Sequence, residues 1–346
     1  GGGNTSFGNT AFGSGGGSAG PVGGHAAPVK KLDPKDFQWM NRTGETLIRE
    51  PGQVAGQQFI IDACVDCDIY IFDQNAAITV DDCKNCRIFI GPCDSSVFIR
   101  DCYNCKCVVI CRQFRTRTCE DCDFQLYCAT RPVIESSKRL RFGCIDFTYQ
   151  GEAAHMEAAS KLSRFTNAWS NIHDFTKAPG NWSYLPPETR GEDLLAPLPK
   201  LACLPPGGTP LPAPFFLKTW GEQKPVSTET CFVLLPGGPG QVQKAETLLA
   251  QMFAAGGVQL VHTNSVKLDA DTANQLVQAS NQGGGPEIQG KEAALVKALT
   301  KEKSIGLEFC GDGCKRMAQS LLPPGELLCT SSTQCSGMYR YMGIEG

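Results

Sequence analysis

Four Cys-x-x-Cys pairs are the most conspicuous residues in this chain whose type and spacing could do chemistry. They are Cys64/Cys67, Cys83/Cys86, Cys102/Cys105 and Cys119/Cys122, and their starts lie 19, 19 and 17 residues apart. Two such pairs at this separation resemble a zinc ribbon. Apolar strand-like residues run between and beyond the pairs, however, whereas a zinc ribbon has little other core. We therefore favour reduced, buried cysteine columns over a metal site.

A second group of reactive side chains lies in the fourth repeat, where Gln113-Phe114-Arg115-Thr116-Arg117 replaces the apolar residues of the other repeats. A constant period near 19 residues is typical of a solenoid, in which each lap covers the apolar face of its neighbour. Such a stack would present this line of polar and cationic side chains on a rigid surface.

Aligning the laps on the first cysteine of each pair predicts which side chains face inward, because alternate strand residues point to opposite faces. The interior columns are Phe59, Ile78, Val97, Phe114 and Ile61, Val80, Ile99, Thr116. The outward columns are Ile60, Thr79, Phe98, Arg115 and Asp62, Asp81, Arg100, Arg117. Gln113, Arg115 and Arg117 are therefore expected to share one exposed face.

The next lap is expected to be Pro132-Val133-Ile134-Glu135, which places Glu135 beside Arg117 and diagonal to Arg115. A carboxylate there could hold a guanidinium in one rotamer through paired hydrogen bonds. An ordinary surface charge pair is the alternative, and it contributes little to stability.

Composition places the chain among soluble, globular proteins without a broad basic surface for nucleic acid. The chain has 346 residues, 41% of them hydrophobic, and a formal net charge of −3. No apolar run approaches the ~18 residues of a membrane-spanning helix, and the first residues lack the apolar core of a signal peptide. We therefore expect a cytosolic chain, where disulfides are disfavoured.

Residues 1–31 are rich in Gly, Ser, Asn and Thr, and this composition predicts disorder. If a removed Met preceded Gly1, the start would match the myristoylation pattern with Thr5 at the hydroxyl position. The alternative is a Gly-rich tail with nothing attached. One acyl chain binds membranes only marginally, so any attachment is expected to be reversible.

The rest of the chain predicts a cap, a linker and a second domain. Ala153 to Trp169 could form a short helix, and Trp169, Phe175 and Trp182 are expected to cover the solenoid. His173 beside Asp174 is interpreted as structural. Pro- and Gly-rich residues 185–227 predict a linker. Residues 228–346 predict a small α/β domain with strands over 231–235, 258–261 and 305–309, and helices over 243–254, 272–279, 291–299 and 314–322.

Several motifs in order give the first part of the chain a family resemblance. They are Val54-Ala55-Gly56-Gln57-Gln58-Phe59, the Asp-Cys-x-x-Cys laps, Gln113-Phe114-Arg115, Pro132-Val133-Ile134-Glu135-Ser136-Ser137 and Trp169-Ser170-Asn171-Ile172-His173-Asp174-Phe175. Residues 32–184 thus resemble the tubulin-folding cofactor C domain. Residues 228–346 more weakly resemble a ferredoxin-like, nucleoside diphosphate kinase-like domain found in a ciliary member of that family.

The resemblance implies a mainly β protein, a right-handed parallel β-helix that activates an Arf-like GTPase in its GTP state. It implies that Arg115 is an arginine finger, with Gln113 and Glu135 beside it. Contacts to the GTPase or its nucleotide are expected from Ser95, Ser96, Arg112, Phe114, Arg117 and Arg100. The protein would hold no metal or cofactor of its own and act on GTP and magnesium held by the partner. It would lie on the cytoplasmic face of membranes, at the cilium or flagellum and basal body, in trafficking of lipidated proteins.

Three departures from the family pattern leave alternatives open. Arg112 stands where the family usually has a first glutamine, which puts one polar contact in doubt. No Cys adjoins Gly1, so only the myristoyl half of a double lipid anchor carries over. His262 lies on an early strand rather than in an Asn-x-x-His-Gly setting, so the second domain is expected not to be a kinase. An effector or scaffold of the GTPase, and a tubulin-folding cofactor, are the alternatives.

Overall fold

The computed structural model describes residues 33–205, 215–223, 229–281, 290–321 and 328–329. A 3-10 helix, η1 (Pro34–Phe37), precedes twelve strands that form one parallel sheet system. These strands are β1 (Gln38–Met40), β2 (Thr46–Arg49), β3 (Phe59–Asp62), β4 (Asp68–Ile71), β5 (Ile78–Asp81), β6 (Arg87–Arg100), β7 (Lys106–Arg117), β8 (Asp123–Cys128), β9 (Val133–Glu135), β10 (Leu140–Cys144), β11 (His173–Asp174) and β12 (Trp182–Tyr184). Gly1 and the rest of residues 1–32 lie outside the described part of the chain.

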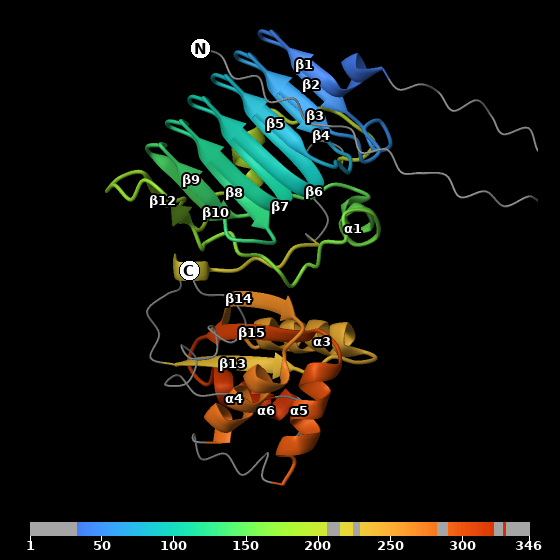
Figure 1. Ribbon diagram of the computed structural model, residues 1–346, viewed down its shortest axis with the longest axis vertical. Coiled ribbons are helices and arrows are strands. Elements are labelled where there is room, and N and C mark those ends of the chain that lie inside the picture. The colour runs from blue at the N-terminus through green and yellow to red at the C-terminus, as the bar shows by residue number, and fades with distance from the viewer. Residues whose placement is uncertain (1–32, 206–214, 224–228, 282–289, 322–327, 330–346) are drawn as a thin grey trace, which may run out of the picture. The chain divides into compact units, whose positions relative to one another are not determined.

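The predicted parallel β-helix is confirmed. One stack of strands runs β1-β3-β5-β6-β7-β9-β11, and a second runs β2-β4-β6-β7-β8-β10-β12, all in parallel register. β6 and β7 are long enough to cross both stacks, and Figure 1 shows the successive laps side by side. Each lap thus buries the apolar face of the lap before it.

The predicted interior columns are confirmed residue by residue. Phe59 pairs with Ile78, Ile78 with Val97, and Val97 with Phe114, and each of these side chains is at most 1% exposed. Thr116 occupies the matching position of the second column and is likewise buried.

Each corner of the solenoid combines a thiol column with residues in the left-handed backbone region. The eight cysteines of the four pairs are free and buried, as predicted. Asp66, Asn85 and Asn104 follow at φ values of 52°, 53° and 49°, which Asp and Asn tolerate better than other residues with a Cβ. Their side chains form a ladder, because Asn85 donates to Asp66 at 3.0 Å and Asn104 to Asn85 at 2.9 Å.

A second apolar core covers the outside of the β2–β12 stack. Tyr70, Phe72, Phe89 and Tyr149 lie in it, together with Leu194. Two short helical segments lie among these covering residues, α1 (Glu152–Ala154) with a π-helical turn η2 (His155–Ala159), and α2 (Gly191–Leu195). The helix expected as far as Trp169 therefore ends ten residues earlier.

Two other expectations for this region need correction. Phe175 does not cover the solenoid, since 63% of its surface is exposed, whereas Trp169 is buried. The segment 185–227 is not a free tether in its described parts, because Leu185, Leu194 and Phe216 belong to the second core.

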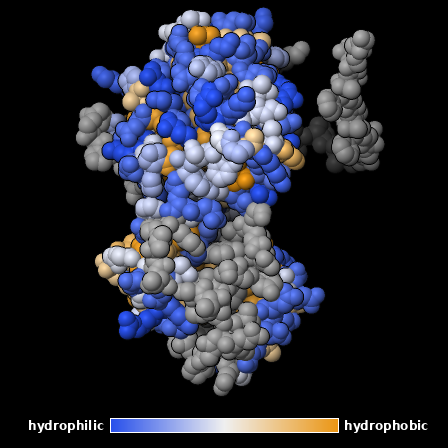
Figure 2. All heavy atoms as spheres, turned by 90° about the vertical axis from the view of Figure 1, so that its left-hand side faces the viewer, coloured by the Kyte–Doolittle hydropathy of each residue, from blue (hydrophilic) through white to orange (hydrophobic). Residues whose placement is uncertain are grey.

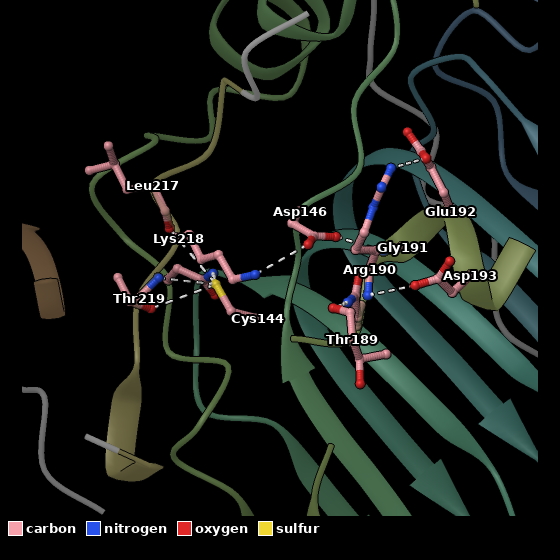
Figure 3. A network of polar contacts seen from close by, with 12 residues as sticks. Cys144, Asp146, Thr189, Arg190, Gly191, Glu192, Asp193, Leu217, Lys218 and Thr219 are labelled. Carbon is pink, nitrogen blue, oxygen red and sulfur yellow. Dashed lines mark hydrogen bonds and ion pairs between the residues drawn. The ribbon is translucent and has the colours of Figure 1, made fainter. Parts of the chain in front are cut away.

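Polar contacts fasten this segment to the end of β10, as Figure 3 shows. The carboxylate of Asp146 accepts hydrogen bonds from Gly191 N at 2.6 Å and from Lys218 Nζ at 3.3 Å. Thr219 N donates to the Cys144 sulfur at 3.4 Å. The Pro and Gly content that predicted a linker therefore indicates irregular backbone. Its buried Leu and Phe side chains hold this backbone against the solenoid.

The C-terminal residues form a four-stranded antiparallel sheet with helices. Its elements are η3 (Gly221–Gln223), β13 (Thr230–Leu235), α3 (Gln241–Ala254), β14 (Gln259–Val266), α4 (Ala270–Asn281), α5 (Glu292–Lys301), β15 (Ser304–Cys310), α6 (Cys314–Leu321) and β16 (Leu328–Cys329). The strand order is β14-β15-β13-β16. The expected strands and helices are all present, while β16 and the second half of β14 were missed. Naming this layer ferredoxin-like stays a prediction.

None of the helices in the described ranges is long and apolar enough to cross a membrane.

Candidate functional site: the arginine face

The outward side chains of one stack of strands form a surface that we call the arginine face. The strands of this stack are β3, β5, β6, β7 and β9. Its two rows are Ile60, Thr79, Phe98, Arg115, Val133 and Asp62, Asp81, Arg100, Arg117, Glu135. The register is the one predicted from the sequence. Each lap contributes the equivalent residue of its strand, and neighbouring strands lie ~4.8 Å apart, so the side chains of each row are evenly spaced.

Arg115 is exposed on β7, and its backbone is flanked on both sides by paired strands. Phe98 of β6 pairs with it on one side and Val133 of β9 on the other. Among the described residues, no hydrogen bond or ion pair engages its guanidinium. Phe114 and Thr116, the residues before and after it, are buried and fix the strand to the core. Arg115 thus combines a backbone fixed by packing with a guanidinium that no described residue engages.

Gln113 lies two residues before Arg115 on the same exposed side of β7. Ser96 Oγ donates to Gln113 Oε1 at 3.0 Å, and the NH₂ group of the amide donates to no residue that the structure describes, so it can donate to a partner. Ser95 is exposed next to it. Ser96, Gln113 and Arg115 therefore share one surface, and Ser95 is an exposed residue beside Ser96.

The second row combines cations with carboxylates. Arg100 forms an ion pair with Asp81, and its guanidinium lies 5.3 Å from the Phe98 ring centroid. Arg117 and Glu135 are exposed neighbours in register. Within the described ranges, Glu135 forms no ion pair with Arg115 or Arg117, so the expected carboxylate clamp on Arg115 is absent from this structure.

Two residues predicted to contact the GTPase are placed elsewhere. Phe114 is 1% exposed and packs edge-on against Phe124 inside the solenoid, which corrects its assignment as a contact residue. Arg112 donates to the Asp94 carboxylate and carbonyl, both at 2.6 Å, and to the Ser160 carbonyl at 3.0 Å. Neighbouring strand residues point to opposite sides, so the side chain of Arg112 lies on the other side of β7 from that of Gln113. There it links β7 to the end of the π-helical turn.

A buried cluster of titratable groups, which the sequence did not reveal, lies under that π-helical turn. Asp73 is 1% exposed and accepts hydrogen bonds from Val54 N and Ala55 N, both at 2.7 Å. The Tyr149 hydroxyl lies 2.7 Å from His155 Nδ1, and burial lowers the pKa of His155. Burial raises the pKa of Glu152 to about 8, although Thr148 donates to its carboxylate.

Two buried cysteines of the solenoid that lie outside the four Cys-x-x-Cys pairs have raised pKa values. Burial raises the pKa of the Cys107 thiol well above its ordinary value, and the pKa of Cys93 to about 12, so both stay protonated at neutral pH. No cluster of three or more His, Cys, Asp or Glu residues suited to a metal occurs in the described part of the chain.

In the C-terminal sheet, His262 lies on β14 with its Nδ1 atom 2.6 Å from a carboxylate oxygen of Glu308, which is fully buried. His262 therefore lies on a strand, as predicted, and is paired with a buried acid.

Comparison with known proteins places this geometry in a family. The family model described as tubulin binding cofactor C matches residues 56–175, which include the arginine face. Protein XRP2 of Xenopus laevis is 42% identical over 298 residues, covering 85% of this chain and 80% of the relative. Protein XRP2 of Danio rerio is 38% identical over 342 residues, covering 95% of this chain and 86% of the relative. The chain belongs to the XRP2 family.

The family resemblance predicted from the five motifs of residues 54–175 is thereby confirmed. The XRP2 match extends well beyond the solenoid and includes the C-terminal layer. Tubulin-folding cofactor C of Arabidopsis thaliana is more distant, being 35% identical over 88 residues, or 24% of this chain and 25% of the relative.

Proposed function

We propose that this XRP2-family protein activates a small Arf-like GTPase by supplying Arg115 in trans as an arginine finger. The observation that carries the proposal is the setting of Arg115, an exposed guanidinium with no partner among the described residues, on a strand paired on both sides. A surface arginine with only a structural role would be expected to pair with a carboxylate, as Arg87, Arg139 and Arg141 do.

The chemistry of GTP hydrolysis explains what such a residue contributes. Negative charge on the transferring phosphoryl group must be stabilised, and an arginine supplied in trans is worth ~10³–10⁵ in rate. A donor held by packed strands needs little reorganisation when the partner docks. GTP and magnesium belong to the partner in this scheme, and the protein itself brings no cofactor.

Neighbouring residues support this role for Arg115. Gln113, held by Ser96, presents its NH₂ donors on the same side as Arg115. Arg117 and Arg100 add positive charge in the adjacent row, where anionic phosphates would be attracted. Arg112 replaces a family glutamine, but its side chain is bound to Asp94 and Ser160, so we infer that it leaves the finger unobstructed.

One observation favours a second candidate, an effector or scaffold that binds the GTP-loaded GTPase without accelerating hydrolysis. Glu135 forms no ion pair with Arg115, so no carboxylate in the described part of the chain fixes the rotamer of the guanidinium. For activation, docking of the partner would have to order this side chain.

The proposal also covers the location of the protein, its acylation and the role of its C-terminal layer. We propose that the protein acts on the cytoplasmic face of membranes at the cilium and basal body, in traffic of lipidated proteins, with reversible acylation of Gly1. The C-terminal layer would be a binding unit and not a nucleoside diphosphate kinase, because His262 is held by buried Glu308. A tubulin partner is the less favoured alternative, since the cofactor C likeness in Arabidopsis covers only 24% of this chain.

A panel of Arf-like GTPases tests the proposal. Affinity for the GTP-loaded and GDP-loaded forms and the single-turnover hydrolysis rate should be measured for each member. The proposal expects one member that binds better in its GTP form and hydrolyses faster. Tight GTP-dependent binding without acceleration would establish the scaffold instead, and absence of binding by every member would refute both.

A further inference from the structure

A hollow beside the arginine face is lined by side chains that the proposed finger does not use. Arg131, His173, Asp174, Lys177 and Trp182 line it, where β11 and β12 close the solenoid. His173 pairs with Val133, and Val133 pairs with Arg115, so the hollow begins two strand spacings, ~10 Å, from the finger. A partner covering Arg115 would therefore also cover the hollow.

The charge of the hollow is predominantly positive. Arg131 and Lys177 are exposed, and among the described residues neither forms an ion pair. Asp174 is the one carboxylate among the five side chains named above, and both of its oxygens already accept hydrogen bonds at 2.8 Å, from Thr176 N and Asn181 Nδ2. The side chains left to meet a ligand are thus cationic, with the half-buried Trp182 ring beside them.

The hollow is also built rigidly. Ser136 N donates to Thr176 Oγ1 at 2.6 Å, and Arg139 N donates to the Gly180 carbonyl at 3.1 Å, so both ends of the Lys177 loop are tied to the solenoid. The Trp182 ring packs edge-on against Phe142 of the core, with centroids 6.4 Å apart. A rigid cationic hollow can bind carboxylates without a large ordering cost.

We infer that this hollow receives a carboxylate-bearing segment of the same GTPase that Arg115 activates, and that it selects which GTPase is accepted. The inference rests on the proposed function. It assigns separate tasks to two parts of one surface: Arg115 acts on the reacting phosphate, whereas Arg131 and Lys177 contribute affinity through charge complementarity. The positive charges of Arg131 and Lys177 would repel partners whose surface at this point is basic.

Charge reversal tests the assignment. The double variant Arg131→Glu/Lys177→Glu is compared with Lys138→Glu, an exposed lysine on the cysteine corner, for affinity to the responding GTP-loaded GTPase and for the hydrolysis rate at saturation. The double variant should raise Kd about 10- to 100-fold at low salt, and less at high salt, because screening weakens the lost attraction. The saturated rate should stay within about twofold of wild type, and Lys138→Glu should match wild type in both.

The outcomes separate this inference from the proposed function. If wild type binds and accelerates but the double variant binds equally well, the hollow assignment is wrong while the finger stands. An equal loss of affinity at low and high salt would also overturn it. If wild type binds no GTPase, the proposed function fails and the inference falls with it. The milder pair Arg131→Gln/Lys177→Gln should give an intermediate Kd at an unchanged melting temperature, which excludes misfolding as the cause.

Discussion

Removing the buried carboxylate of Glu152 should change how the stability of this protein depends on pH. Glu152 is 1% exposed in α1, its Oε2 atom accepts a hydrogen bond from Thr148, and its Oε1 atom has no partner. Burial raises its pKa from 4.5 to about 8. The folded protein therefore holds a proton on Glu152 that the unfolded chain releases, and stability must fall as pH rises from about 4.5 to about 8.

The size of the effect follows from this shift. One pKa unit corresponds to about 1.4 kcal/mol, so the unfolding free energy should fall by about 1.4 kcal/mol per pH unit through this one group. His155 works in the opposite direction, since its lowered pKa gives stability that is lost as pH falls below about 6.5. Between pH 6.5 and 8 His155 adds no further change, so the contribution of Glu152 amounts to about 2 kcal/mol.

Urea unfolding of wild type and Glu152→Gln across this pH range provides the assay. The amide cannot ionise, so the variant should gain about 2 kcal/mol on wild type between pH 6.5 and 8. Glu157→Gln, an exposed position on the adjoining π-helical turn η2, should follow wild type throughout. Parallel pH profiles for wild type and Glu152→Gln would contradict a raised pKa of Glu152 in the folded protein, because they would show that the carboxyl titrates alike in both states.

Three further substitutions test other parts of the structure. Phe114→Ala should lower the unfolding free energy by about 3–5 kcal/mol, because it empties a site inside the solenoid, and an unchanged urea midpoint would contradict its burial. Gly191→Ala should destabilise by about 1–3 kcal/mol, since a Cβ there would lie 2.6 Å from that of Phe147, and a neutral effect in thermal unfolding would contradict this packing. Arg112→Gln should cost about 1 kcal/mol by loss of its bond to Asp94, yet keep GTP hydrolysis within about twofold, and a large gain in rate would show that Arg112 obstructs the finger.

The repeat made the solenoid predictable from sequence because a single period determines the strand register. Once Phe59 was aligned with Phe114, the inward and outward faces of every lap followed, and so did the exposure of Arg115. The helices and strands of the C-terminal layer were likewise predicted from apolar periodicity, apart from the second half of β14 and the two-residue strand β16.

Contacts that depend on side-chain rotamers or on irregular backbone could not be predicted. Register placed Glu135 beside Arg117, but register does not determine whether a carboxylate reaches a guanidinium. The Asp94 and Ser160 partners of Arg112 come from an irregular stretch of β6 and from the end of the π-helical turn, and neither has a periodic signal. The hollow at Lys177 depends on a loop that places residues distant in sequence together.

In the proposed function, Arg115 acts on the transition state of GTP hydrolysis and contributes little to binding. The most direct measurement is the single-turnover hydrolysis rate of the responding GTPase at saturating wild type and at saturating Arg115→Ala, with Arg117→Ala as a matched control on the same strand. Arg115→Ala should lose ~10³-fold or more of the acceleration with Kd nearly unchanged, whereas Arg117→Ala should retain most of it. Equal acceleration by wild type and Arg115→Ala would contradict the claim.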